Sequence, residues 1–226
     1  MNSLERGRVR FYLPPGFGSQ PSALRWAASG SIIKGEFLVI MSDGCTGIFV
    51  AREGEILFIQ VRGGGNYQNA GSLRQCGQEA LEQGCKMICL DLAQCRSLDS
   101  TFLGVLAGLG LRLGEKGYAD ALHVCNAGDH TLQSCEALGL DRVVQFDAGP
   151  WSVAVKPPGL DEFQKLPGSE LRAVRKGDKN DSAELILEAH EQLCKADEGN
   201  EARFKEVKEY LRQGLTRGPE DPGIEH

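Results

Sequence analysis

Residues 86–116 read KMICLDLAQCRSLDSTFLGVLAGLGLRLGEK, and this stretch decides the fold of the chain. Its beginning, Lys86 to Leu92, is a nearly continuous apolar run, as expected of a strand that is covered on both faces of a sheet. From Thr101 to Lys116 the apolar residues recur at helical spacing. A strand followed by a helix in this way predicts a parallel crossover unit of an α/β fold.

The alternation of strand and helix continues on both sides of this stretch. Upstream, TGIFVARE and EILFIQVR are two β-rich runs separated by Gly54, which predicts a hairpin and therefore an antiparallel portion of the sheet. We expect RGGGN, residues 62–66, to end the second strand as a turn, because no Gly-Lys-Ser/Thr follows to make a phosphate loop. The remaining expected elements are a helix at 69–83 ended by Gly84, a strand at 121–126, a helix at 129–138 ended by Gly139 and a strand at 142–146.

The flanks of this α/β region, residues 46–147, differ from it in composition. Residues 1–45 form an extension of unknown role, in which only 36–41 resembles a strand. Residues 148–181 are rich in Pro, Gly and charge, which predicts a linker with at most one short helix. We expect a flexible tail at 216–226.

Two amphipathic helices are predicted between this linker and the tail, at Ser182 to Ala196 and Glu201 to Gln213, with Asp181 and Glu184 in a capping-box arrangement. Glu201 and Lys205 have the favourable i, i+4 spacing. The two helices form a predicted hairpin, residues 182–215. Their narrow apolar stripes could pack on each other, on the α/β domain or on a second copy of the chain.

Composition and charge exclude several classes of partner. The 226 residues include 31 acidic and 25 basic side chains, a formal net charge of −6, so nothing attracts phosphate backbones or anionic membranes in general. No apolar run approaches the roughly 18 residues of a membrane span, and the first residues lack the apolar stretch of a secretory signal. We therefore expect a cytoplasmic protein that has neither nucleic acid nor a membrane as its main partner.

The eight cysteines do not predict a metal or a cofactor. No C-x-x-C pair occurs, and Cys89 and Cys125 fall inside expected strands. The sequence shows no convergent set of acid, base and nucleophile, so we expect no catalytic residue. The residues from which a metal site could be built are Cys85, Cys89, Cys95, His123 and Cys125, but a free, buried thiol is the favoured interpretation. A small enzyme or ligand carrier stays open as an alternative, with Cys125, His123 or the turn at Gly63 to Gly65 as its candidate residues.

Asp99 and Ser100 lie between the end of a strand and the helix predicted from Thr101. A serine there is a natural N-cap, which stabilises a helix by ~1 kcal/mol without any further function. The helix that follows indicates a further function. One apolar stripe is enough to bury one face of a helix, but the opposite side of this helix also consists of small or apolar residues. The residues of that other side are Leu103, Gly104, Ala107, Gly108, Leu111 and Gly114. Each interior glycine costs ~1 kcal/mol relative to alanine, so we expect a close backbone approach here, either to the sheet or to a partner.

With these motifs in place, EILFIQVRGGGNYQNAGSLRQ, CLDLAQCRSLDSTFLGVL, ALHVCNAG and EALGLDRVVQF together resemble a STAS domain of the anti-sigma-factor-antagonist type. The resemblance covers roughly the middle hundred residues and implies a STAS-like mixed sheet with helices, to which this chain adds an α-helical C-terminal extension. In that family a D-S motif ends a strand, and a serine kinase of the histidine-kinase-like ATPase fold phosphorylates the serine. Asp99 and Ser100 match the motif.

The resemblance implies a partner-switching phosphoprotein of signal transduction and transcription regulation. Its free form would bind the anti-sigma kinase, and its Ser100-phosphorylated form would not. A serine phosphatase and homodimer formation also fit this scheme. The partner-binding residues that the resemblance implies are Asp99, Ser100, Thr101, Leu103, Gly104 and Ala107.

Two departures from the family pattern stand out. The family usually has a small residue two positions after the serine, where this chain has Phe102, and most minimal members lack the long flanks. A second hypothesis is therefore a STAS scaffold subunit of a larger complex, of lipid-trafficking or stress-signalling type, that is not phosphorylated and uses its terminal helices for assembly.

Overall fold

The computed structural model describes residues 46–147, 158–159, 161–167, 169 and 179–217. The strand expected at 36–41, most of the linker and the end of the tail lie outside the described residues. Within them, the mixed α/β fold with C-terminal helices that the sequence predicts is confirmed.

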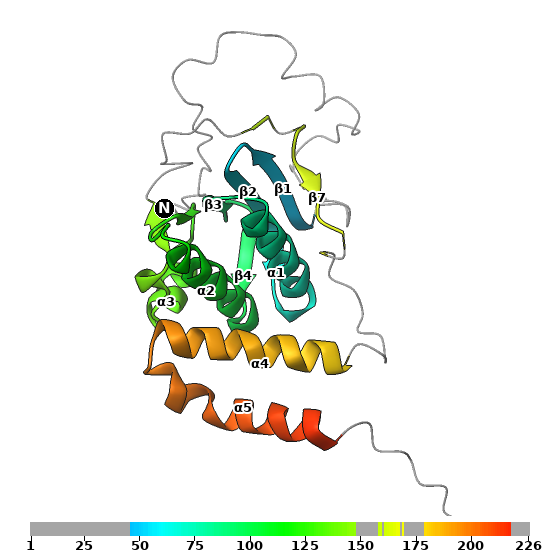
Figure 1. Ribbon diagram of the computed structural model, residues 1–226, viewed down its shortest axis with the longest axis vertical. Helices are drawn as coiled ribbons and strands as arrows, with labels where there is room; N and C mark the ends of the chain where they lie inside the picture. Colours follow the sequence, from blue (N-terminus) through cyan, green and yellow to red (C-terminus); the bar gives the residue numbers. More distant parts are fainter. Residues whose placement is uncertain (1–45, 148–157, 160, 168, 170–178, 218–226) are drawn as a thin grey trace, which may run out of the picture. The chain divides into compact units, whose positions relative to one another are not determined.

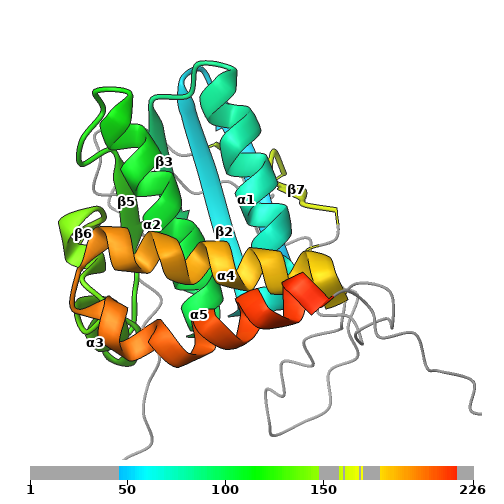
Figure 2. The same cartoon turned by 60° about the horizontal axis from the view of Figure 1, so that its bottom comes forward.

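The described strands form one seven-stranded sheet in the order β6-β5-β3-β2-β1-β7, with β4 paired to the end of β2. Figure 1 labels β1 to β4 and β7, and Figure 2 labels β5 and β6. Strands β2, β3, β5 and β6 are mutually parallel, and the hairpin of β1 with β2 supplies the predicted antiparallel portion. The strands are β1 Gly47–Glu53, β2 Ile56–Gly65, β3 Met87–Asp91, β4 Cys95–Leu98, β5 Leu122–Cys125, β6 Gln145–Asp147 and β7 Gln164–Lys165.

Helices α1 and α2 lie side by side on one face of this sheet (Figure 2). The helices are α1 Tyr67–Glu82, α2 Ser100–Glu115, α3 Asp129–Glu136, α4 Lys179–Ala196 and α5 Asn200–Arg217, with a short 3₁₀ turn at Leu140–Arg142. Gly84 and Gly139 have φ of 85° and 69°, so both occupy the left-handed region that ends a helix, as the sequence predicts.

The sequence did not predict strands β4 and β7. Each of them overturns an expectation about the segment in which it lies or with which it pairs. The glycines after Arg62 do not form a turn: they continue β2, and Gly63 to Gly65 pair with β4. Gly65 permits a close approach, because a Cβ on it would lie 2.6 Å from Leu98 Cδ2 and 2.8 Å from the Phe102 ring. Strand β7 lies in the segment expected to be a linker, and it pairs with β1.

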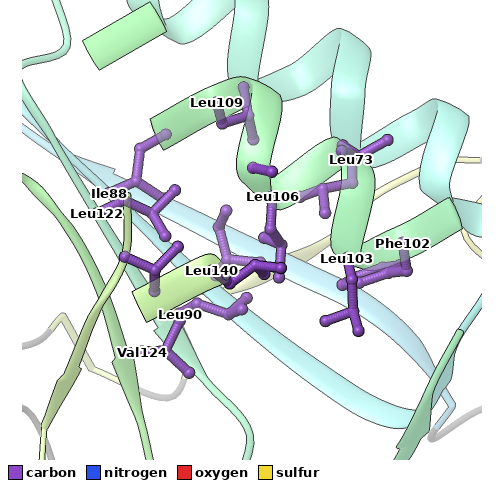
Figure 3. Packing of buried hydrophobic residues seen from close by; sticks show 14 of the residues in the cluster. Leu73, Ile88, Leu90, Phe102, Leu103, Leu106, Leu109, Leu122, Val124 and Leu140 are labelled. Atoms are coloured by element: carbon purple, nitrogen blue, oxygen red, sulfur yellow. The ribbon is translucent and has the colours of Figure 1, made fainter. Parts of the chain in front are cut away.

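The hydrophobic core lies between the sheet and the two helices that cover it. Leu106 and Leu109 of α2 pack with Leu73 of α1 and with Ile88 of β3 (Figure 3). The alternation along β2 is clear, since Leu57, Ile59 and Val61 all belong to this core cluster. The same cluster includes Leu185, Leu193 and Ala196 of α4, so the core continues from the sheet through α1 and α2 to this helix.

Helices α4 and α5 form the predicted hairpin, and α4 runs across α2 (Figure 2). Two local predictions about it are wrong. Helix α4 begins at Lys179, so Asp181 lies in its first turn and does not cap it. Glu201 pairs with Lys208, at 2.6 Å, and not with Lys205. None of the helices within the described residues is long and apolar enough to cross a membrane.

Candidate protein-binding site at the start of α2

Asp99, and not Ser100, caps helix α2, because the helix begins one residue earlier than predicted. Asp99 Oδ1 accepts a hydrogen bond from the backbone amide of Phe102 at 2.8 Å. Its other oxygen, Oδ2, accepts one from the amide of Tyr67, the first residue of α1, at 2.9 Å. One carboxylate therefore satisfies a first-turn amide of each helix and fixes the two helix starts relative to each other.

The capping by Asp99 leaves the hydroxyl of Ser100 available for another contact. Ser100 Oγ and His190 Nε2 of α4 share a hydrogen bond of 3.1 Å. Ser100 is partly exposed, whereas His190 is only 5% exposed. The candidate switch residue thus contacts the C-terminal hairpin of its own chain.

His190 occupies an apolar setting that favours its neutral form. Burial lowers the pKa of its imidazole, and Lys208 of α5 acts in the same direction. The backbone of Ile186 and the carboxylate of Asp99 oppose this pKa shift. The ring of Phe204 lies 4.4 Å from the imidazole, centroid to centroid, so both helices of the hairpin hold His190 in place.

The remaining residues that the resemblance implies for partner binding are buried in the folded chain. Thr101 is 4% exposed and Ala107 is fully buried. Leu103, 2% exposed, belongs to the hydrophobic core cluster. The apolar surface expected on this side of α2 is therefore not open in this conformation of the chain.

The contact of α2 with α4 rests on small residues at a spacing of four. A Cβ on Gly104 would overlap the carbonyl of Ala189 and lie 2.8 Å from the Ala189 Cβ, while one on Gly108 would lie 3.0 Å from Gln192 Cγ. Ser100, Gly104 and Gly108 thus form a small-residue groove along α2 in which α4 lies. This answers the question that the glycines raised: Gly104 and Gly108 permit the close approach of another helix and not of the sheet.

The edge of the groove is ionic and loosely filled. Glu188 of α4 pairs with Arg74 of α1 and lies 3.9 Å from Arg112 of α2. All three side chains are about 35 to 43% exposed. A cavity of about 20 Å³, room for about one water molecule, remains between α1, α2 and α4.

Phe102, at which the chain departs from the family pattern, is a core residue of the domain. Its ring is fully buried and points into the core, where Gly65 makes room for it. The departure from the family pattern at this position is a matter of core packing.

The cysteine and histidine candidates for an enzyme or carrier do not converge at this site. His123 Nδ1 bonds Asp147 Oδ2 at 3.0 Å, and Cys125 Sγ lies 3.9 Å from the same oxygen, on neighbouring strands far along the chain from Ser100. Burial raises the pKa of Cys89 to about 12. No group of His, Cys, Asp and Glu suited to a metal ion occurs among residues whose positions the structure gives.

With this geometry established, comparison with known proteins gives the class of the domain. Residues 48–145 match the family model described as Mlab, STAS domain. This segment is a STAS domain, as the sequence resemblance predicts. No curated protein matches the chain.

Several solved structures of anti-sigma factor antagonists are similar to the chain. One, from Thermotoga maritima and proposed to be such an antagonist, is 20% identical, with 44% of this chain and 85% of that one covered at a TM-score of 0.40. Unphosphorylated SpoIIAA is 14% identical (45% and 89% covered, TM-score 0.39), and phosphorylated SpoIIAA of Bacillus is 17% identical (44% and 91%, TM-score 0.37). These values are too low to transfer a function to this chain.

Sequence reasoning missed His190, Ala189 and Glu188 as members of this site. The apolar stripe of α4 was visible in the sequence, but its target was not. Asp99 and Ser100 are both good capping residues, so sequence alone could not decide which of them caps α2.

Proposed function

We propose that this chain is a cytoplasmic, phospho-regulated protein-binding switch of the anti-sigma-factor-antagonist type, and that it acts by binding and not by catalysis. In this proposal the unphosphorylated domain binds an anti-sigma serine kinase through the start of α2, and a phosphate on Ser100 prevents that binding. Asp99, Thr101, Leu103, Gly104 and Ala107 would form or support the binding surface.

One observation carries the proposal: in this STAS domain Ser100 has a hydroxyl that its helix does not need. Because Asp99 satisfies the first-turn amide, Ser100 is free to bond a second protein segment, and it does so with His190. A hydroxyl in contact with a removable segment is a suitable place for a switch, since its modification changes the contact without breaking the helix cap.

The physical consequence of phosphorylation follows from this contact. A phosphate adds about −1.5 to −2 charge at pH 7, and at a helix N-terminus the backbone amides and the dipole tolerate it. The same phosphate beside Asp99 would place unpaired negative charge against any helix that docks on α2, and desolvating that charge is unfavourable. Docking would be lost while the domain stays folded.

The test compares three tagged full-length variants from the native host. Ser100→Ala should capture a serine kinase of the ATPase fold, and Ser100→Asp should not. Ser97→Asp is the matched control, because Ser97 is exposed on β4 only three residues away and should behave like the unaltered chain. The proposal fails if Ser100→Asp captures the kinase as well as Ser100→Ala does, or if neither binds purified kinase.

A second candidate function is favoured by the coverage of the site. Because α4 lies against Gly104 and Gly108, and Thr101 and Ala107 are buried, the chain could serve as an unphosphorylated STAS subunit of a larger complex, with the hairpin as part of its permanent structure. Intact-mass measurement of the native protein with and without phosphatase separates the two: a phosphate at Ser100 supports the switch, and its absence under all growth conditions supports the scaffold.

A further inference from the structure

We propose that the groove of Ser100, Gly104 and Gly108 is a helix-binding surface, and that α4 is its occupant in cis, held there until another helix of the same chemistry replaces it. This rests on the proposed function of the same site and adds its regulation. The external partner would present an amphipathic helix with a small residue in the place of Ala189 and a carboxylate in the place of Glu188.

The composition of the two sides of α2 supports an exchangeable occupant. On the sheet side, Phe102 and Leu106 are no more than 1% exposed and belong to the cluster of large apolar residues of the core. On the groove side the contact consists of backbone approach at Gly104 and Gly108, one hydrogen bond at Ser100, an ionic edge, and apolar side chains of α4 such as Leu185 and Leu193 that belong to the core cluster. Such a surface recognises the shape of a helix more than one particular sequence.

The groove also specifies what its occupant must look like. Gly104 leaves space only for a small side chain, because the backbone carbonyl of Ala189 already lies against it. Arg74 and Arg112 place positive charge at the edge of the groove, and Glu188 of α4 forms ion pairs with both. Apolar anchors at Leu185 and Leu193, four residues before and after Ala189, complete the pattern of an amphipathic helix that docks by one face.

Because α4 is part of the same chain, it competes strongly with any external helix for the groove on α2. Helix α4 belongs to the same chain as α2, so its docking is intramolecular. Linked binding segments typically reach an effective concentration of about millimolar, so an external helix competes only when it binds tightly or when the cis contact is weakened.

Ser100 lies at the point where the occupant can be released. Its Oγ is 3.1 Å from His190 Nε2, so three phosphate oxygens on that atom would require α4 to move away. For the same reason a kinase gains access to Ser100 only after α4 has left the groove. Occupation by α4 would therefore limit both partner binding and phosphorylation.

The test uses the full-length chain and a fluorescein-labelled peptide of residues 179–217 as the probe. Ala189→Leu places a larger side chain against Gly104 and should expel α4, so the labelled peptide should bind this variant at least about tenfold more tightly than the unaltered chain. The matched control is Ala202→Leu, the same change at an exposed position of α5, which should bind as weakly as the unaltered chain. Fluorescence anisotropy gives the affinities.

The outcomes separate this inference from the proposed function. If Ala189→Leu and the milder His190→Ala both keep a native circular dichroism spectrum and bind no peptide, α4 is a fixed part of the domain and the inference is overturned; if Ala189→Leu does not fold, His190→Ala alone decides. If the peptide binds and Ser100→Asp, added to the same variant, abolishes binding, both ideas hold. If the peptide binds equally well with Ser100→Asp, occupation in cis stands and the phospho-switch fails.

Discussion

Helix α2 has two buried sides that are made in different ways. Toward the sheet it presents large side chains, and Phe102, Leu106 and Leu109 are each no more than 2% exposed. Toward α4 it presents small residues, and the closest contacts are formed at Ser100, Gly104 and Gly108. Both sides exclude water, but the first does so by filling volume and the second by letting two backbones meet.

This difference separates stability from recognition within one helix. Burial of large apolar side chains supplies most of the free energy of folding, since each contributes about 1.5 to 3 kcal/mol. Close backbone approach supplies little transfer free energy and demands a matching shape. We therefore expect changes on the sheet side to alter the free energy of unfolding of the whole domain, and changes on the groove side to alter the position of α4.

The largest expected effect comes from Phe102→Ala on the sheet side. Removal of a fully buried ring beside Gly65 should lower the free energy of unfolding by about 3 to 5 kcal/mol, through lost transfer free energy and the cavity left behind. Urea unfolding followed by circular dichroism measures it. Tyr210→Ala is the control, because Tyr210 is 76% exposed and its loss should change the free energy of unfolding by less than about 0.5 kcal/mol. Equal effects of the two would contradict the placement of Phe102.

Gly104→Ala tests the groove side and should have the next largest effect. Alanine favours a helix over glycine by about 1 kcal/mol, but here its Cβ would overlap the Ala189 carbonyl, and overpacking costs about 1 to 3 kcal/mol. We expect the amides of α4 to lose protection in hydrogen exchange while those of β2 and β3 keep theirs.

Gly114→Ala is the matched control for that change. Gly114 lies in the same helix, and apart from the neighbouring backbone of that helix nothing lies within 4 Å of an added Cβ, so alanine there should stabilise the protein by up to about 1 kcal/mol and leave α4 protected. If the two glycine variants behave alike, α4 does not lie as closely on α2 as the structure indicates.

The same contrast explains what the sequence could predict. The packing of α2 on the sheet could be predicted from periodicity, because the apolar pattern around residues such as Ile88, Leu106 and Leu122 is enough to predict strands and the buried face of a helix. The contact of α2 with α4 could not be predicted, because α4 lies about ninety residues later in the sequence. The glycines of α2 indicate a close approach but do not identify the segment that makes it. Strand β4, with the partly exposed sequence CRSL, has no apolar alternation to reveal it, and its pairing depends on the glycines that end β2.

Acidic pH should loosen the groove side and leave the sheet side unchanged. Burial lowers the pKa of His190 below its ordinary value of 6.5, although Asp99 and the Ile186 backbone act in the opposite direction. His190 therefore binds a proton less readily when α4 is docked on α2 than when α4 is detached. Docking of α4 is therefore fully stable above about pH 6.5 and weakens as the pH falls below it. Nuclear magnetic resonance titration of His190, with exchange protection of α4 corrected for intrinsic rates, checks this.

His190→Gln removes the titrating group and is the comparison for this effect. Protection of α4 in that variant should no longer fall in the same pH window. A titration midpoint of His190 at or above 6.5 would show that the imidazole is not desolvated by docking.

The smallest expected effect belongs to the ionic edge of the groove. Glu188→Gln removes the charge that faces Arg74 and Arg112, but all three side chains are more than a third exposed, so the loss should be below about 1 kcal/mol and should vanish at high salt. Exchange protection of α4 at low and high salt measures it. Glu191→Gln is the control, because Glu191 pairs with Arg212 inside the hairpin, at 2.7 Å, and not with α2. A loss in Glu188→Gln that is the same at both salt concentrations would mean that Glu188 acts through packing against α1 and α2 and that charge does not select the helix in the groove.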